Sequence, residues 1–280
     1  AAAVCTVAAL LFATLSTQAQ FFDPTSYKGA FAPAPTAMWT DGWCNWNPDS
    51  TNYPATTVTV SGSITANTTW TTGKVYVLSG RITVTAGTTL TIQPGVIVKG
   101  EVGTGANASA LVIARGAKIN AAGTATQPII FTSVADEIKP GQIASPNMDP
   151  TVEGLWGGLI VLGRAKASLP GDVAEFAIEG IPATDTNGLY GGDDATDNSG
   201  IVKYISIRHG GALIGDGNEI NGLTLGGVGS GTVIENIEVV ANQDDGIEWF
   251  GGTVNVTNAV VWNAGDDAMD TDQAWSGTLD

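Results

Sequence analysis

The sequence is short of basic residues and histidine and has no long apolar run outside its N-terminus. Eleven Lys and Arg stand against 27 Asp and Glu among 280 residues, for a formal charge of −16 at pH 7. Nucleic-acid binding needs a positively charged surface, so this balance excludes that class of partner. A single histidine excludes a zinc site built on several imidazoles. Because hydrophobic residues reach 43% and charged residues only 14%, a disordered chain is also excluded.

Cysteine is also scarce, with only Cys5 and Cys44 in the chain. Cys5 lies in the apolar N-terminal segment, which we expect to be removed, so Cys44 would have no intrachain partner. A protein of this size without a disulfide must take its stability from a buried core.

The first 19 residues are apolar, carry no charge and are too short to span a membrane. Small residues before Gln20 resemble a signal-peptidase site. We interpret residues 1–19 as a truncated secretory signal peptide, and we expect a protein that is secreted or displayed at the outer cell surface. The alternative is a buried apolar helix. No later segment is long and apolar enough to predict a membrane span.

Residues 20–56 form a predicted N-terminal cap segment without regular period, rich in Pro, Trp and Phe. Aromatic side chains at this density need a surface to bury against. We favour a cap that covers the open end of a repetitive domain, because terminal repeats must be covered. An aromatic sugar-binding platform is the alternative.

From residue 57 onward, short Val-, Ile- and Thr-rich runs alternate with glycine turns, and no amphipathic helix interrupts them. The runs repeat. Leu90, Ile92, Gly95 and Val98 recur 21 positions later as Leu111, Ile113, Gly116 and Ile119. Ile234, Ile237 and Val239 recur 22 positions later as Val256, Ala259 and Val261.

This period predicts an all-β right-handed parallel β-helix over residues 57–280, in which each coil takes roughly 20–25 residues. Equivalent residues of successive coils would then stack about 4.8 Å apart. The chain stops within the pattern, so we expect the β-helix to be incomplete at its C-terminus. Residues 136–154 and 180–200 break the repeat and are predicted to be loops that leave the coil.

Several sequence segments resemble segments of one family of bacterial proteins: TTLTIQPGVIVKG, WGGLIVLGRA, EINGLTLGGVGSGT and DDGIEWFGGTVN. The chain is similar there to large secreted or surface parallel β-helix proteins of Bacteroidetes-type bacteria, and YKGAF and WTDGWCNWNP resemble their N-terminal segment. The resemblance implies a secreted β-helix, with a C-terminal sorting domain in some members. It implies no catalytic residues, because the activity of this family is mostly unassigned.

A stacked acidic cluster is the first candidate site. Asp244, Asp245 and Glu248 recur 22 positions later as Asp266, Asp267 and Asp270. Carboxylates one strand spacing apart repel unless one is protonated or a cation lies between them. No Lys or Arg follows Arg208, so local compensation is scarce. We therefore consider a Ca²⁺ site that includes Asp245, Glu248 and Asp270, a catalytic carboxylate pair, and a solvated acidic stripe.

The catalytic hypothesis has a local resemblance behind it. Asn242-Gln243-Asp244 and Gly265-Asp266-Asp267 resemble the Asn-x-Asp and Gly-Asp-Asp elements of polygalacturonase-type β-helix hydrolases. The resemblance implies Asp267 as general acid, with Asp244 and Asp266 activating water. The later His-Gly and Arg-x-Lys elements of that family are absent from this sequence.

A second acidic group lies in the Gly-rich loop and includes Asp193, Asp194 and Asp197. Carboxylate and amide oxygens on such a loop suit Ca²⁺, although the spacing is not that of an EF-hand. The alternative is a solvated loop held by side-chain turns.

Together these observations predict a secreted cell-surface β-helix with a structural or binding role toward a glycan or partner protein, stabilised by Ca²⁺. Two alternatives stay open. One is a polysaccharide-degrading hydrolase or lyase that uses the stacked aspartates. The other is a stalk that displays a further domain.

Overall fold

A computed structural model describes residues 26–31, 33–40, 56–213 and 220–280. The chain divides into two units, Ala1–Trp39 and Thr40–Asp280. In the first unit the rings of Phe31 and Trp39 stack with centroids 6.1 Å apart, and the indole nitrogen of Trp39 donates to the Ala30 carbonyl. The predicted signal peptide and most of the predicted cap lie outside the described residues, so both stay predictions. No helix within the described ranges is long and apolar enough to cross a membrane.

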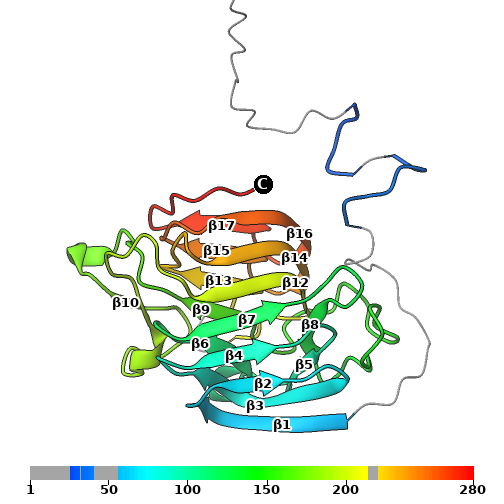
Figure 1. Ribbon diagram of the computed structural model, residues 1–280, viewed down its shortest axis with the longest axis horizontal. Helices are drawn as coiled ribbons and strands as arrows, with labels where there is room; N and C mark the ends of the chain where they lie inside the picture. Colours follow the sequence, from blue (N-terminus) through cyan, green and yellow to red (C-terminus); the bar gives the residue numbers. More distant parts are fainter. Residues whose placement is uncertain (1–25, 32, 41–55, 214–219) are drawn as a thin grey trace, which may run out of the picture. The chain divides into compact units, whose positions relative to one another are not determined.

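The second unit is a right-handed parallel β-helix, as the sequence predicts (Figure 1). Its coils have three faces, and every strand pair of the main sheet is parallel. Face 1 stacks the first part of β1 (Thr56–Ile64) and β3 (Lys74–Val84), then β5 (Ile97–Gly100), β8 (Ile129–Ser133) and the later parts of β12 (Gly200–Arg208), β14 (Val233–Asn242) and β16 (Val256–Ala264).

Face 2 carries the candidate site. It stacks the ends of β1 and β3, β6 (Ala110–Ile113), β9 (Leu159–Leu162), β13 (Leu223–Gly226), β15 (Ile247–Phe250) and β17 (Met269–Asp272). Face 3 stacks β2 (Thr68–Trp70), β4 (Thr89–Ile92), β7 (Lys118–Ala122) and the first residues of β12, β14 and β16.

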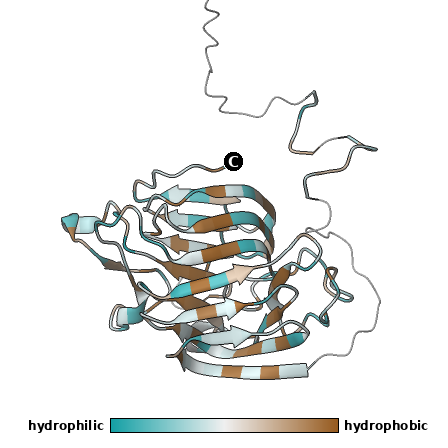
Figure 2. Cartoon of the chain, in the orientation of Figure 1, coloured by the Kyte–Doolittle hydropathy of each residue, from teal (hydrophilic) through white to brown (hydrophobic). Residues whose placement is uncertain are grey.

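The interior of the coil is apolar because strand side chains alternate between the two faces of a sheet. On face 2 the inward row runs through fully buried Ile82, Leu111, Leu159, Leu223 and Ile247. Figure 2 shows hydrophobic bands recurring along the stacked strands. The hydrophobic contacts between successive coils hold the solenoid together.

The late 22-residue period is confirmed, and the early 21-residue one is wrong in its register. Ile234 pairs with Val256 and Ile237 with Ala259. Leu90, however, pairs with Thr68 and Ile119 on face 3.

Leu111 instead pairs with Ile82 and Leu159 on face 2. Both Leu90 and Leu111 point into the core, because every strand of a β-helix repeats the same inward alternation. The 21-residue match therefore aligned strands of two different faces.

Two insertions leave the coil, in the regions that the sequence predicts. The first joins β8 to β9 and packs Ile138 on the outer side of face 1. The second joins β9 to β12, so it begins earlier than the predicted residue 180. It contains a small antiparallel pair, β10 (Phe176–Ala177) and β11 (Leu189–Tyr190), with helical turns at η2 (Pro170–Asp172) and η3 (Thr186–Gly188). A third helical turn, η1 (Gly105–Asn107), lies between β5 and β6.

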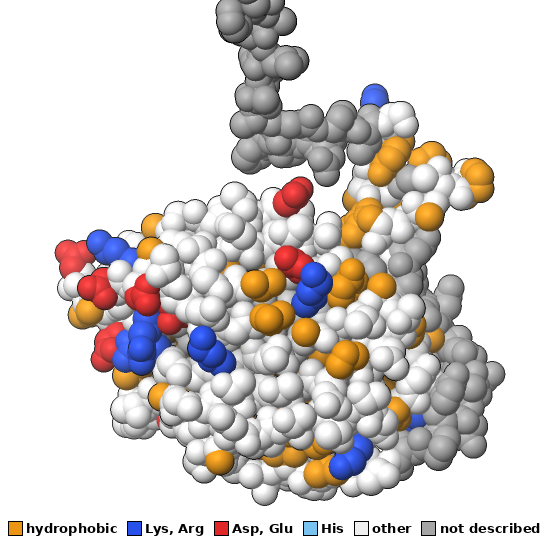
Figure 3. Space-filling view, viewed as in Figure 1, with side chains coloured by type: hydrophobic (Ala, Val, Ile, Leu, Met, Phe, Trp, Pro, Cys, Tyr) orange, Lys and Arg blue, Asp and Glu red, His pale blue; other side chains and the backbone are white. Residues whose placement is uncertain are grey.

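The second insertion covers the outer side of face 2. Its Leu169, Ile178, Ile181 and Tyr190 form one buried cluster with outward side chains of face 2, among them Ile160. Figure 3 shows charged side chains of both signs gathered over this insertion, whereas much of the rest of the visible face is uncharged. Ion pairs from Arg81 to Asp185 and from Arg115 to Glu175 tie the insertion to the coil.

The turns between faces use left-handed backbone at equivalent positions. Tyr204, Asn236 and Asn258 have φ of 50°, 57° and 57° and lie one above another between faces 3 and 1. Asparagine tolerates this conformation better than other residues with a side chain, so its recurrence supports a regular corner.

Candidate functional site

The candidate site lies where the chain turns from face 1 into face 2 in the last two coils. β14 ends at Asn242 and β15 begins at Ile247, so Asp244 and Asp245 lie in the connecting turn. One coil later, Asp266 and Asp267 lie in the turn before β17. Asp245 and Asp267 are on adjacent rungs, because the Asp267 amide donates to Asp245 Oδ1 at 2.8 Å.

Glu248 and Asp270 extend the cluster onto the outer side of face 2. Ile247 and Trp249 are fully buried in the coil, so the intervening Glu248 points outward. Glu248 pairs with Asp270 across the β15–β17 register. The same alternation that builds the core therefore puts two carboxylates side by side on the outer side of the coil.

The carboxylates form two overlapping triads that share Asp245. One oxygen from each of Asp244, Asp245 and Asp266 lies within 4.8 Å of the others, and the same holds for Asp245, Glu248 and Asp270. Asp245 and Glu248 are only 7% and 9% exposed, so water screens them poorly. This is a compact, half-buried set of hard oxygen donors.

Burial and like charges raise the pKa of both central carboxyl groups. The pKa of Asp245 rises to about 6, first through desolvation and then through neighbouring aspartates, including Asp244. The pKa of Glu248 rises to about 8 through desolvation, with Asp245 and Asp270 adding to it. A cation between these groups would reverse the effect, because it favours their charged forms.

Two asparagine side chains complete the site. Asn221, 3% exposed, donates from Nδ2 to Glu248 Oε2 at 2.5 Å, and its Oδ1 has no hydrogen-bond partner. Asn242, 1% exposed, donates from Nδ2 to the Asp245 carbonyl at 2.7 Å, and its Oδ1 is likewise unpartnered. A buried amide oxygen without a partner costs free energy. Because the Asn221 Nδ2 faces Glu248, a reversed Asn221 amide would turn this oxygen toward the carboxylates, where it suits a cation ligand.

The ion pairs of the described residues do not include the two buried carboxyl groups of this corner. Within the described ranges, the ion pairs are Arg81–Asp185, Arg115–Glu175, Lys203–Glu235 and Arg208–Glu238, and none includes Asp245, Glu248 or Asp270. No Lys or Arg is among the groups that shift the pKa of Asp245 or Glu248, so a proton or an ion from solution is what would offset the charge of these two buried carboxyl groups.

The three residues proposed for hydrolysis are only partly brought together. Asp244 and Asp266 join Asp245, whereas Asp267 contributes its backbone amide and lies exposed. The oxygens of Asp244 and Asp266 come within 4.8 Å. In the hydrolase hypothesis both of these carboxylates activate the water, so their closeness is compatible with it. Asp267, the general acid of that hypothesis, belongs to neither triad, so the catalytic arrangement stays a prediction.

The loop aspartates Asp193, Asp194 and Asp197 form no comparable group among the described residues. Asp194 Oδ1 accepts from the backbone amide and hydroxyl of Thr196. Asp197 is buried, accepts from the Ser199 hydroxyl and has a pKa raised by desolvation. These carboxylates hold turns, and a loop Ca²⁺ site stays a prediction that the geometry does not favour.

Sequence reasoning missed Asn221 and Asn242 as members of the site. Asn221 precedes β13, one rung before Asp245, because Leu223 pairs with Ile247. The 22-residue period could not find it, since 24 positions separate Leu223 and Ile247. Asn242 stood in the sequence beside Asp244 and was assigned only to a hydrolase-like motif.

A family model described as a pectate-lyase-like β-helix domain matches residues 62–280 of the chain. The match begins within β1 and includes every strand of the three faces after it. No curated protein and no solved structure matches.

Proposed function

Since the chain belongs to the pectate-lyase-like β-helix domain family, we propose that it is a Ca²⁺-binding β-helix with a structural or binding role at the outer cell surface. The observation that carries the proposal is the pair of carboxylate triads sharing Asp245. The ion would join the turn before β15 to the turn before β17 and so fasten two successive coils. Secretion rests on the apolar segment at residues 1–19.

The chemistry of the donors supports Ca²⁺ in particular. Ca²⁺ takes about six to eight oxygen ligands, with carboxylates, amide carbonyls and water in flexible geometry. Asp245, Glu248 and Asp270 supply carboxylates, and a reversed Asn221 amide would add a neutral oxygen. Mg²⁺ suits the site less, because it demands near-ideal octahedral geometry and gives up its water reluctantly.

A polysaccharide hydrolase or lyase is the second candidate, and one observation favours it. The raised pKa of Glu248, about 8, keeps a proton on this side chain at neutral pH, whereas the pKa of neighbouring Asp245 is about 6. Two close carboxyl groups whose pKa values are pushed apart are typical of a general acid and its partner base. A polysaccharide panel tests this candidate. If the wild type releases reducing ends or unsaturated products and Glu248→Gln does not, the enzymatic role replaces the binding role.

Calorimetric titration of the chelator-treated protein with Ca²⁺ tests the proposal. We expect saturable binding, and we expect Asp245→Asn to weaken it by about tenfold or more, because Asp245 belongs to both triads. Asp193→Asn is the matched control, since it removes the same charge from the predicted loop site. Wild-type affinity in Asp245→Asn, or loss of affinity in Asp193→Asn alone, would overturn the assignment to the corner.

A further inference from the structure

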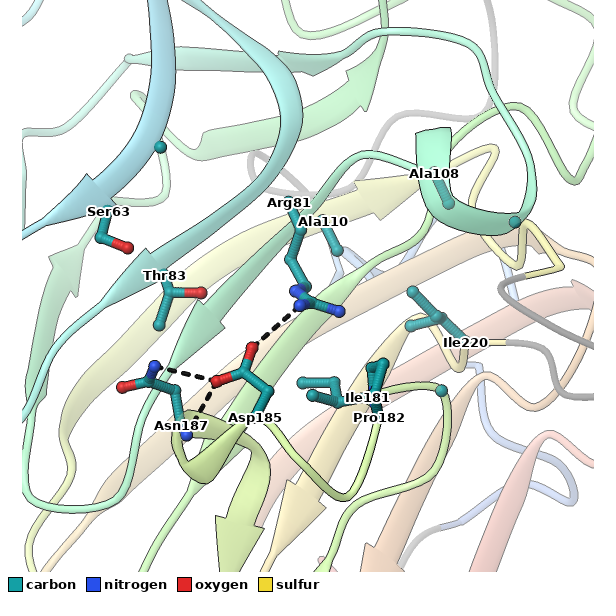
Figure 4. A pocket seen from close by; sticks show the side chains of 13 residues that line it. Ser63, Arg81, Thr83, Ala108, Ala110, Ile181, Pro182, Asp185, Asn187 and Ile220 are labelled. Atoms are coloured by element: carbon teal, nitrogen blue, oxygen red, sulfur yellow. Dashed lines mark hydrogen bonds and ion pairs between the residues drawn. The ribbon is translucent and has the colours of Figure 1, made fainter.

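A cleft of about 550 Å³ opens on the outer side of face 2, beside the first coils of the β-helix. Its walls come from β1, β3 and β6 on one side and from the second insertion on the other. Figure 4 shows Arg81, Asp185 and Asn187 joined by hydrogen bonds, with Ser63 and Thr83 on the strands beside them. Its volume is in the range of pockets that hold small organic ligands.

The polar wall is preorganised, and its described residues carry no net charge. Arg81 Nη2 lies 2.9 Å from Asp185 Oδ2. Asp185 Oδ1 accepts from the backbone amide of Asn187 at 3.1 Å and from its Nδ2 at 2.9 Å. The Arg81 and Asp185 side chains are still 30% and 26% exposed, so their remaining donors and lone pairs face the cleft.

The opposite wall is aliphatic. Ile181 and Pro182 come from the insertion, and Ala108, Ala110 and Ile220 come from the coil side. Ile181 and Ile220 are nearly fully buried in the cluster beneath the insertion, so this wall is anchored. The cleft therefore presents polar groups on one side and apolar carbon on the other.

We propose that this cleft binds a neutral saccharide of roughly one or two hexose rings. Adjacent hydroxyl groups of a sugar both donate and accept, which matches a guanidinium beside a carboxylate, an amide and two hydroxyls. The apolar C–H face of the sugar ring matches the aliphatic wall. Asp185 neutralises Arg81, so an anionic ligand gains little, and among the described residues no aromatic side chain lines the cleft to stack a nucleobase.

The inference names the ligand class of the binding role proposed above, and it does not depend on the cation. The test is saturation-transfer NMR and calorimetry on the full chain. The ligands are glucose, galactose, mannose, N-acetylglucosamine, cellobiose and lactose, with glucuronate, galacturonate and glycine as charged and zwitterionic probes. We expect millimolar or tighter binding of at least one neutral sugar and none of the charged probes.

Comparison of two variants distinguishes loss of a direct contact between Arg81 and the sugar from loosening of the second insertion. Arg81→Met should weaken sugar binding by about tenfold or more, since it removes charged donors from the cleft. Arg115→Met is the matched control, because it breaks the Arg115–Glu175 ion pair that ties the same insertion to the coil outside the cleft. Asp185→Asn should admit the uronates, because Arg81 then lacks its counter-charge.

Some outcomes would overturn the inference. No neutral sugar bound by a protein that still binds Ca²⁺ would remove the saccharide cleft and leave the cation proposal intact. An equal loss of sugar affinity in Arg81→Met and Arg115→Met would also remove the saccharide cleft and leave the cation proposal intact. So would a wild-type protein that binds glycine or a uronate more tightly than any neutral sugar. Sugar binding without Ca²⁺ binding would instead sustain the cleft and remove the cation.

Discussion

Removing bound cations should make the stability of the β-helix depend on pH in an unusual direction. The pKa of Glu248 in the folded protein is raised from 4.5 to about 8. Between these values the folded state holds more protons than the unfolded state, so the free energy of unfolding falls as pH rises. Most surface carboxylates act in the opposite sense, because ion pairs lower their pKa.

The size of the effect follows from the shift. Between pH 5 and pH 8 the folded state holds up to one more proton on Glu248 than the unfolded state. Over about 3 pH units this difference lowers the free energy of unfolding by at most ~4 kcal/mol. Solvent relaxation near the surface reduces this to about 2 kcal/mol. For a domain of this size, about 2 kcal/mol lowers the Tm by about 4–8 °C.

Scanning calorimetry in EDTA across this pH range measures the slope. Glu248→Gln should flatten it, because glutamine keeps a hydrogen-bond acceptor for Asn221 without a charge to bury. Excess Ca²⁺ should also flatten it for the wild type and raise the Tm at pH 8. A wild-type Tm that is constant in EDTA, or a slope that Glu248→Gln leaves unchanged, would refute the reasoning.

Two further predictions concern stability. Asn236 has φ of 57°, so Asn236→Ala should lower the free energy of unfolding by about 1–2 kcal/mol, whereas Asn236→Gly should lower it less; urea unfolding of both variants checks this order. Glu238 is fully buried on face 1 and is held by the Ser206 hydroxyl and by Arg208. Arg208→Met should therefore cost about 3–5 kcal/mol, and Arg208→Met combined with Glu238→Met should recover part of it; a double variant less stable than the single one would contradict this.

The architecture could be predicted from the sequence because every coil of a β-helix repeats one simple pattern. Each strand alternates inward and outward residues, and glycine or asparagine marks the turns. That rule gives the fold and the late 22-residue register of Asp245 and Asp267. It does not say which face a strand belongs to, so Leu90 and Leu111 matched by pattern although they lie on different faces.

The insertions limited what the sequence could reveal about the site. Their lengths break the period, so Asn221 could not be aligned with Asp245 by counting. Arg81 and Asp185 meet across 104 positions, and nothing in the local sequence of either residue indicates the other. Contacts between a coil and its insertion depend on how the insertion folds back, which periodicity does not encode.

One outward row of face 2 shows why the two sites lie where they do. Thr83, Val112, Ile160, Thr224, Glu248 and Asp270 succeed one another in register along the coils. The insertion buries the apolar middle of this row and leaves the cleft at Thr83. Toward the other end the row becomes acidic, and burial together with neighbouring carboxylates raises the pKa of Glu248 there to about 8. The apolar middle of the row anchors the insertion that forms one wall of the cleft, whereas the acidic end of the same row forms the candidate cation site, so the two lie at different heights on face 2.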